Sequence, residues 1–257
     1  MGSLAGNAVT ERRERDSASI PGYGRMGGAV PIFHPLGMEE RAAEVRDLLE
    51  TGTGVLSETL PIETPKLGAL LVADADWREA PREHERPYPP GLPYLTQSVE
   101  PPVLVLPETL SPAFRPHAGA TWPLVVWHEL AHAFLLQKPV PRVPAWLREF
   151  VPQALSAAVA QRACLLDGHL ARIESAPGFT VREFAAPADA ERQMEFQNLL
   201  LRLGAAALEE FGEGFLRKLA HGLWKETEVV GEERAEELLA GSLGHCGREW
   251  LEGRPEF

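Results

Sequence analysis

Two histidines and a glutamate stand inside a strongly apolar helical segment, and this combination restricts the fold more than any other feature of the chain. The segment is 121–136 (TWPLVVWHELAHAFLL), which contains His128, Glu129 and His132. Positions i and i+4 share one face of a helix, so the two imidazoles point to the same side. Burying two imidazoles and a carboxylate among apolar turns is costly unless a partner is present. The fold must therefore bring a partner to this face.

A zinc ion is the partner that this spacing favours. Zinc binds neutral imidazole nitrogens and lowers the pKa of a bound water to about 7. Glu129 follows the first histidine directly and is turned toward the open side of such an ion, where a carboxylate can move the proton of that water. We therefore predict one Zn²⁺ per chain on His128 and His132. The alternative is a helix with two core histidines that are satisfied by hydrogen bonds.

A third protein ligand is needed, and Glu149 is the best candidate. It follows a proline-rich break at 139–144 (PVPRVP) that could reverse the chain and bring the first turn of a second helix beside the middle of the first. The alternative role of Glu149 is that of a solvated carboxylate at a helix start, where the helix dipole favours it. Asp167 and His169 are the fallback ligands.

The pattern resembles a known family of metallopeptidases. A metzincin would have Gly at 135 and His at 138, where this chain has Leu135 and Lys138. By contrast, HELAH followed after a short break by Trp-Leu-Arg-Glu at 146–149 is similar to the gluzincins, in which a Trp-x-x-Glu segment carries the third ligand. The segment at 236–253 also resembles the closing helices of bacterial members.

The resemblance implies a zincin-like, two-lobed α+β fold in which the HExxH helix forms the floor of a cleft between the lobes. It assigns His128, His132 and Glu149 as zinc ligands and Glu129 as the general base of peptide-bond hydrolysis. A peptide or protein would be the substrate. The strand near Val103–Leu106 would be the cleft edge that pairs with an extended peptide.

Three residues depart from the gluzincin pattern. Phe150 stands where the family usually has Gly. Gln153 replaces an acid that often orients a ligand histidine, and it can form hydrogen bonds but carries no charge. Pro152 is expected to kink the second helix or to delay its start. These departures support a second hypothesis, a zinc-stabilised binding or regulatory protein with little turnover. Hydrolysis of a non-peptide amide or ester at the same centre is a third.

A residue that stabilises the oxyanion is harder to assign. Many relatives use a Tyr or His downstream of the motif, but the three tyrosines of this chain all precede it. His221, in a helical segment far downstream, is the candidate. It could equally be a half-exposed helix histidine. Tyr94, on the long proline-rich loop, could also reach the site.

The element order predicts a small mixed sheet with the HExxH helix, followed by a mainly helical lobe. We expect a disordered tail at 1–20 and a single zincin-like catalytic domain at 21–254, with an α/β subdomain at 21–138 and a helical subdomain at 139–254. The predicted strands are 67–73 and 103–106, with a loop at 78–102 between them. The predicted helices are 38–51, which Gly52 and Gly54 would end, then 121–136, 145–166, 188–203, 205–224 and 230–252.

Composition excludes several other classes of protein. A formal charge of −12 disfavours a nucleic-acid partner, because phosphate binding needs a concentrated basic surface. Two cysteines do not form a disulfide framework, and Cys164 is expected in the core; the alternative is a single bridge between Cys164 and Cys246. No segment has the apolar length of a membrane span, and the N-terminus lacks the apolar core of a signal peptide. We therefore expect a cytoplasmic protein with no membrane partner.

Overall fold

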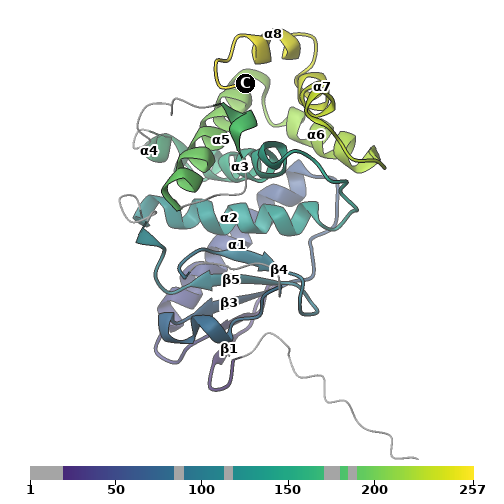
Figure 1. Ribbon diagram of the computed structural model, residues 1–257. Helices are drawn as coiled ribbons and strands as arrows, with labels where there is room; N and C mark the ends of the chain where they lie inside the picture. Colours follow the sequence, from purple (N-terminus) through teal and green to yellow (C-terminus); the bar gives the residue numbers. More distant parts are fainter. Residues whose placement is uncertain (1–19, 84–89, 113–117, 171–179, 185–189) are drawn as a thin grey trace, which may run out of the picture.

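The chain forms an α+β fold, seen in a computed structural model that describes residues 20–83, 90–112, 118–170, 180–184 and 190–257 (Figure 1). The strands are β1 (Gly24–Met26), β2 (Ile32–His34), β3 (Gly68–Val72), β4 (Tyr94–Thr96) and β5 (Val103–Pro107). The helices are α1 (Glu39–Thr59), α2 (Ala118–Leu135), α3 (Ala145–Arg162), α4 (Leu166–Leu170), α5 (Ala190–Phe211), α6 (Gly214–Lys225), α7 (Glu232–Leu243) and α8 (Gly247–Glu252), with short 3-10 helices at Asp74–Glu79 and Val181–Glu183. The tail predicted at 1–20 lies outside the described residues except for Ile20.

The predicted small mixed sheet is confirmed. Its strand order is β1-β2-β3-β5-β4, with β2, β3 and β5 parallel and the two outer strands antiparallel to their neighbours. The prediction that Val103–Leu106 forms an edge was wrong, because β5 pairs with β3 on one side and with β4 on the other. The edge strand on this side of the sheet is β4, which lies within the segment predicted as a loop at 78–102.

The two faces of the sheet pack against different partners. Ala69 and Leu71 of β3 belong to the large core that also contains the apolar faces of α1 and α2. Leu70 and Val72 point the opposite way, into a smaller cluster with Trp77. This alternation follows from the two-residue period of a strand. Because both faces are covered, β3 and β5 are apolar throughout, which explains their short continuous hydrophobic runs.

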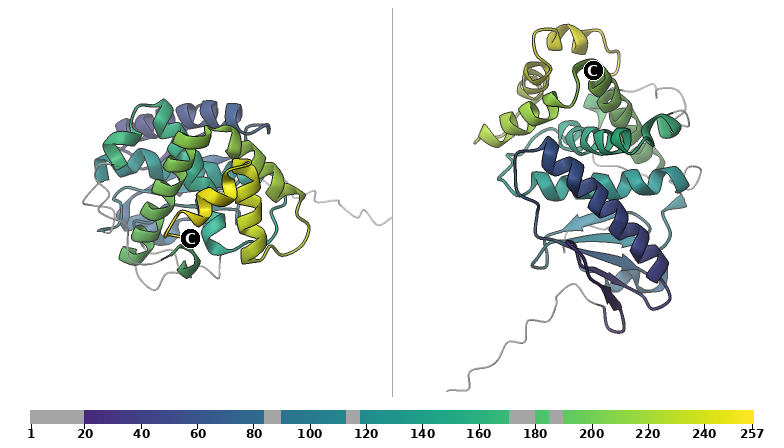
Figure 2. Two further views of the ribbon diagram at one scale, coloured as in Figure 1. Left: turned by 90° about the horizontal axis from the view of Figure 1, so that it is seen from above. Right: turned by 180° about the vertical axis from the view of Figure 1, so that it is seen from behind.

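The elements are stacked from the sheet toward the C-terminal helices. In Figures 1 and 2 the sheet lies at one end, α1 and α2 cover it, α3 and α5 follow, and α6 to α8 lie at the far end. Helix α2 packs on α1 and on α3, and α3 packs extensively on α5. The HExxH helix therefore lies between the sheet and the helical part. Among the described residues, no helix combines the length and the apolar character needed to cross a membrane.

Helix α1 continues to Thr59, so the prediction that Gly52 and Gly54 end it was wrong. Gly52 is buried where α1 meets α2, and a Cβ atom there would lie 2.7 Å from Cδ1 of Trp127. The indole of Trp127 also donates a hydrogen bond to the carbonyl of Leu48 at 2.8 Å. The missing side chain of Gly52 therefore permits a close helix contact rather than a helix end. Gly54 is exposed, and a Cβ atom there would have no neighbour within 4 Å.

The helix break predicted at Gly204 was also wrong, for the same reason. Helix α5 runs through Gly204, where a Cβ atom would lie 2.8 Å from Cα of Ala154 in α3. The break comes at Gly212, whose φ of 66° is accessible mainly to glycine. The single helix predicted at 230–252 is likewise two helices, separated at Gly244 with φ 94°.

Two smaller predictions concern α3 and the residues after it. The helix begins at Ala145, so Pro152 does not delay its start, and the alternative, a kink at Pro152, stays a prediction. The prediction for Cys164 was wrong. Cys164 is exposed rather than in the core. It follows the end of α3 with a positive φ of 57°, and both it and Cys246 are free thiols.

Substitution of Gly204 tests the close contact between α3 and α5. We expect Gly204→Ala to lower the free energy of unfolding by about 1–3 kcal/mol, because backbone atoms of Ala154 cannot move aside cheaply. Gly54→Ala, at an exposed helix position with free space, is the control and should raise it by about 0.5–1 kcal/mol. Urea unfolding of both variants measures the difference. Equal stabilisation by the two substitutions would contradict this packing.

Candidate metal centre

Helix α2 presents His128 and His132 on one face, one helical turn apart. The opposite side of the helix is anchored in the core by residues such as Trp127 and Leu130, which are buried against α1. This packing fixes the rotation of the helix about its axis. His128 is consequently buried, while the side chain of His132 retains 21% exposure. Both imidazoles thus lie at the edge of the core, within reach of solvent on one side.

The chain reversal after α2 brings Glu149 to this face. Helix α2 ends at Leu135, and α3 begins at Ala145 and packs along α2, so that Glu149 in its early turns lies opposite the histidines. Oε2 of Glu149 is 3.4 Å from Nε2 of His128 and 3.5 Å from Nε2 of His132. The two Nε2 atoms are 3.1 Å apart. The structure therefore brings together the three residues that the sequence singled out as metal ligands.

The spacing of these three atoms fits a tetrahedral metal ion. Zinc ligands lie about 2.0–2.1 Å from the ion, so neighbouring ligand atoms of a tetrahedron are about 3.3–3.4 Å apart. The three distances between the ligand atoms of His128, His132 and Glu149, 3.1, 3.4 and 3.5 Å, lie close to this value. Two imidazoles with one carboxylate are also a donor set that zinc accepts, and three protein ligands leave a fourth position open. The residues present therefore fit a zinc ion.

The electrostatics of the cluster favour a cation among its three acceptors. Burial alone would raise the pKa of Glu149, but hydrogen bonds and charge from His128 and His132 hold its pKa well below the ordinary value. Burial alone would lower the pKa of His132, but the hydrogen bond and charge of Glu149 outweigh burial and raise its pKa. Glu149 thus favours a proton on His132. A metal ion would have to displace that proton.

Glu129 lies beside the cluster but outside the set of candidate ligands. Its pKa is raised, first by burial and also by the charge of Glu149, against the opposing effect of the two histidines. The backbone N–H of Leu95 donates a hydrogen bond to its carboxylate. Leu95 belongs to β4, so the edge strand of the sheet lies directly at the site. A proton-accepting carboxylate and a strand edge therefore flank the same group of ligand atoms.

The groups behind the ligands differ from what the sequence suggested. Gln153 was expected where relatives carry an acid that orients a ligand histidine. Instead, Nε2 of Gln153 donates to Oε1 of Gln197, and Nε2 of Gln197 donates to Oε2 of Glu149 at 3.3 Å. Nδ1 of His128 is buried and has no hydrogen-bond partner among the described residues. The support of the site is thus directed at the carboxylate ligand rather than at that histidine.

Gln197 could not be recognised as part of the site from the sequence. It lies in α5, and a single glutamine in an amphipathic helix, next to the buried Phe196, forms no motif with the residues of α2 and α3. Only the packing of α5 on α3 reveals its contact with Glu149. The one available signal was Gln153 itself, since a buried amide in α3 requires a partner from a neighbouring helix.

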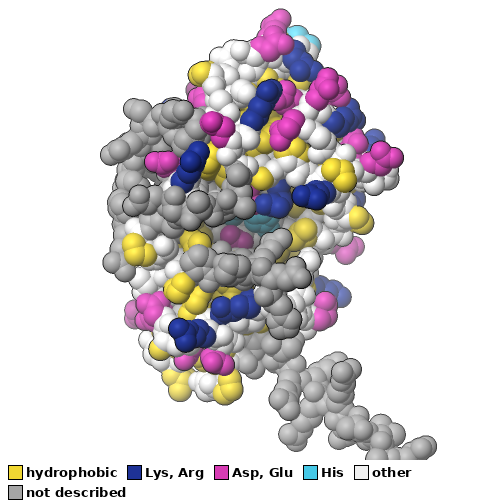
Figure 3. Space-filling model, viewed as in Figure 1, with side chains coloured by type: hydrophobic (Ala, Val, Ile, Leu, Met, Phe, Trp, Pro, Cys, Tyr) yellow, Lys and Arg dark blue, Asp and Glu magenta, His cyan; other side chains and the backbone are white. Residues whose placement is uncertain are grey.

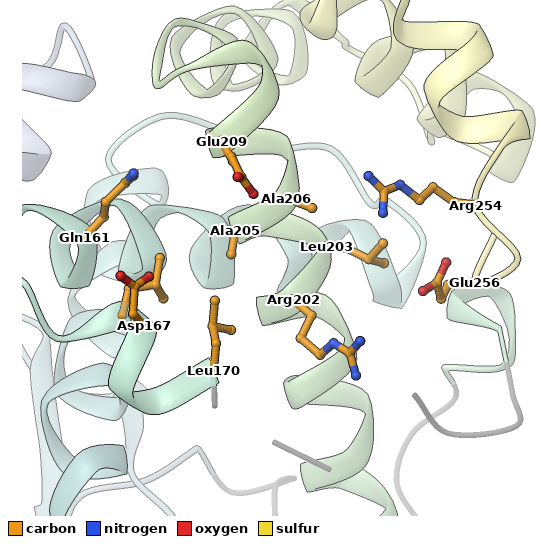
Figure 4. Close-up of a pocket in the computed structure, with 11 residues that line it drawn as sticks. Gln161, Asp167, Leu170, Arg202, Leu203, Ala205, Ala206, Glu209, Arg254 and Glu256 are labelled. Atoms are coloured by element: carbon orange, nitrogen blue, oxygen red, sulfur yellow. The ribbon is translucent and has the colours of Figure 1, made fainter. Parts of the chain in front are cut away.

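The fallback ligand Asp167 is not part of the cluster. Asp167 is exposed in α4 and lines a separate cavity of about 660 Å³ between α3, α4, α5 and the C-terminal residues, together with Arg202, Glu209 and Arg254 (Figure 4). The side chain of His169 lies outside the described residues. The cavity has charged groups of both signs but none of the three candidate ligands.

The two candidates for oxyanion stabilisation lie in different surroundings. His221 is exposed on α6, and none of the described contacts joins it to the cluster, so its role stays a prediction. Tyr94 is buried on the face of the sheet away from α2, where its hydroxyl donates to the carbonyl of Pro81. The side chain of Tyr94 therefore does not point toward Glu129. The neighbouring residue, Leu95, reaches Glu129 through its backbone N–H.

The cluster reaches the surface at the junction between the sheet and the helical part. In the space-filling view, histidine surface is visible at mid-height of the molecule, close to acidic and basic side chains (Figure 3). The side chains of His132 and Glu149 are 21% and 15% exposed, respectively. The open side of the site is therefore accessible from solvent.

Comparisons with known proteins add no identification. No family model matches the chain, and no curated protein is significantly similar to it. The likeness to gluzincins accordingly rests on the HELAH and Trp-Leu-Arg-Glu segments and on the geometry described above.

Zinc affinity should depend on pH in a direction set by His132. Because the pKa of His132 is raised, protons compete with the metal already above the ordinary histidine value of about 6.5. We expect the affinity to fall steadily between about pH 8 and about pH 6. Competition with a chromophoric chelator at several pH values measures this. In Glu149→Ala the fall should begin at lower pH, because the carboxylate that raises the pKa of His132 is gone. An affinity that does not change over this range would contradict the proposed ligand set.

Proposed function

We propose that the protein is a zinc-dependent metallopeptidase of gluzincin type. The observation that carries the proposal is the convergence of Nε2 of His128, Nε2 of His132 and Oε2 of Glu149, with Glu129 beside them. The proposal extends to the fold, as a zincin-like domain spanning 21–254 with the site between a sheet-bearing lobe and a helical lobe. The stacking of the elements around α2 supports this arrangement.

The residues divide the chemistry of hydrolysis between them. His128, His132 and Glu149 would hold the zinc, which when bound lowers the pKa of a water and polarises the scissile carbonyl. Glu129 accepts the proton of the attacking water and then delivers it to the leaving amine nitrogen. Its raised pKa, caused first by burial, makes it a stronger proton acceptor than an ordinary carboxylate. The N–H of Leu95 holds this carboxylate in place.

The position of β4 supports a peptide as the substrate. Its outer side is an edge of the sheet, and one of its residues, Leu95, already contacts Glu129. An extended peptide that added to this edge by backbone hydrogen bonds would run past the candidate metal ligands. We therefore propose Tyr94–Thr96, rather than Val103–Leu106, as the strand that pairs with a peptide.

A zinc-stabilised binding or regulatory protein with little turnover is the second candidate. The unpartnered Nδ1 of His128 favours it, because second-shell hydrogen bonds usually raise the basicity of a ligand histidine. The buried Phe150 beside the third ligand is a further departure from active relatives. Against it stand Glu129, for which a purely structural site has no use, and the three-residue ligand set, since closed structural sites usually have four. Hydrolysis of a non-peptide amide or ester would use the same groups.

Replacement of Glu129 separates these functions. We expect Glu129→Gln to bind zinc as the wild type does and to lose peptide cleavage by about 10²- to 10⁴-fold in kcat/KM, because the amide cannot accept the proton. The assay is cleavage of a diverse peptide library together with measurement of bound zinc. Glu228→Gln, at an exposed position that makes no described contact, is the matched control and should cleave normally.

A wild type that binds zinc but cleaves no peptide would favour the binding protein. Cleavage of esters or other amides alone, lost equally in Glu129→Gln, would favour the third activity.

A further inference from the structure

A chain of two side-chain amides leads from the interior of the helical part to the carboxylate of Glu149. Gln153 lies in α3, one turn after Glu149, and is only 9% exposed. Its Nε2 is 2.5 Å from Oε1 of Gln197 in α5. The Nε2 of Gln197 is in turn 3.3 Å from Oε2 of Glu149. Two amides thus connect α3 to α5 and return to the carboxylate on α3.

The direction of this chain is set by the carboxylate at its end. An ionised carboxylate only accepts hydrogen bonds, so Gln197 must turn its NH₂ group toward Glu149. Its carbonyl oxygen then faces Gln153, which must present its own NH₂ group. No other orientation of the two amides satisfies both contacts. Gln153 therefore fixes the orientation of Gln197, and Gln197 donates to Glu149.

The contact is made at the oxygen that faces the histidines. Oε2 of Glu149 is the atom near both Nε2 atoms, and it also accepts from Gln197. The other oxygen, Oε1, is approached by Nε of Arg148 at 3.4 Å, but that arginine side chain is 57% exposed. Apart from the two histidines of α2, Gln197 is the only described side chain from another helix that donates to this carboxylate. An ionised carboxylate oxygen can accept this hydrogen bond and still bind a metal ion.

Packing of α3 on α5 does not require the two amides. Gly204 lies against Ala154 in close contact, and Leu199 and Leu200 are buried in the same core. The apolar residues therefore hold the helix pair together. Helix packing therefore does not explain why two amides lie at this junction. Their hydrogen bonds to each other and to the carboxylate of Glu149 do.

We propose that Gln197, oriented by Gln153, is a positioning residue that holds Oε2 of Glu149 ready to bind the metal. This inference rests on the proposed metal centre, but it does not depend on peptidase activity. It assigns to Gln153 a function different from that of the acid found there in relatives. The acid supports a histidine ligand, whereas Gln153 supports the carboxylate ligand through a second residue.

Zinc affinity of substituted proteins tests the proposal. In competition with a chromophoric chelator, we expect Gln197→Leu to bind zinc about 10- to 100-fold more weakly than the wild type, which is the usual cost of losing such a second-layer contact. Gln153→Leu should show a smaller loss. The matched control is Gln161→Leu, an exposed glutamine on the same helix, which should bind zinc as the wild type does.

The isosteric variant Gln153→Glu tests the direction of the chain. A carboxylate at 153 accepts only, so Gln197 would turn its NH₂ group toward it and present its oxygen to Glu149. Zinc affinity should then fall further than in Gln153→Leu, although the size of the side chain is unchanged. An affinity equal to that of the wild type would overturn the proposal.

A double-substitution cycle distinguishes positioning from general stability. If Gln197 acts through Glu149, then Gln197→Leu should lower zinc affinity in the wild-type background but not in a Glu149→Ala background. An equal loss in both backgrounds would mean that Gln197 only stabilises the fold, and would overturn the proposal. The visible spectrum of the cobalt-substituted protein provides a second readout and should change in Gln197→Leu. Failure of the metal centre itself would be evident separately, as absence of zinc binding in the wild type.

Discussion

Three acceptor atoms face one another across the junction of α2 and α3, and the remainder of the site depends on what holds them there. Nε2 of His128, Nε2 of His132 and Oε2 of Glu149 are separated by 3.1 to 3.5 Å. Acceptors at this distance repel unless a proton or a cation lies between them. The lowered pKa of Glu149 and the raised pKa of His132 have the direction expected of a cluster that favours positive charge. In the proposed metal centre, one zinc ion would satisfy all three atoms at once.

Close helix packing makes this convergence possible. Gly52 lets α1 approach the back of α2 at Trp127, and Gly204 lets α5 approach α3 at Ala154. The first contact fixes the rotation of the helix that carries the histidines. The second places Gln197 within reach of Glu149. The proline-rich connection between α2 and α3 then needs only to reverse the chain, because packing on both sides sets the positions of the two helices.

Features that depend on local spacing could be predicted from the sequence. The i, i+4 pair of histidines required only a helix, and Glu149 required only a chain reversal, which Pro139 and Pro144 indicated. The α+β class and the small mixed sheet followed from short apolar runs before longer helical ones. Features that depend on contacts between distant segments could not be predicted. The HELAH pattern carries no information about which strand lies at the edge of the sheet. The residues of β5 were therefore wrongly predicted to form the edge that β4 forms.

Glycine was the main source of error in predicting the helices. Gly52 and Gly204 have the same local sequence signal as Gly212, which does separate two helices. Only the neighbours that pack against them, Trp127 and Ala154, distinguish a close contact from a helix end. Gln197 was missed for a related reason. Its role depends on a hydrogen bond to Glu149, which lies 48 residues earlier in the chain.

The central claim is that His128, His132 and Glu149 bind one zinc ion, and elemental analysis tests it most directly. The protein would be reconstituted with zinc, dialysed against metal-free buffer and analysed for metal, alongside Glu149→Ala and the exposed-site control Glu228→Gln. We predict one zinc per chain in the wild type and in the control, and loss of most of the metal in Glu149→Ala. A wild type that retains no zinc would contradict the claim and leave the two histidines as core residues paired with a carboxylate.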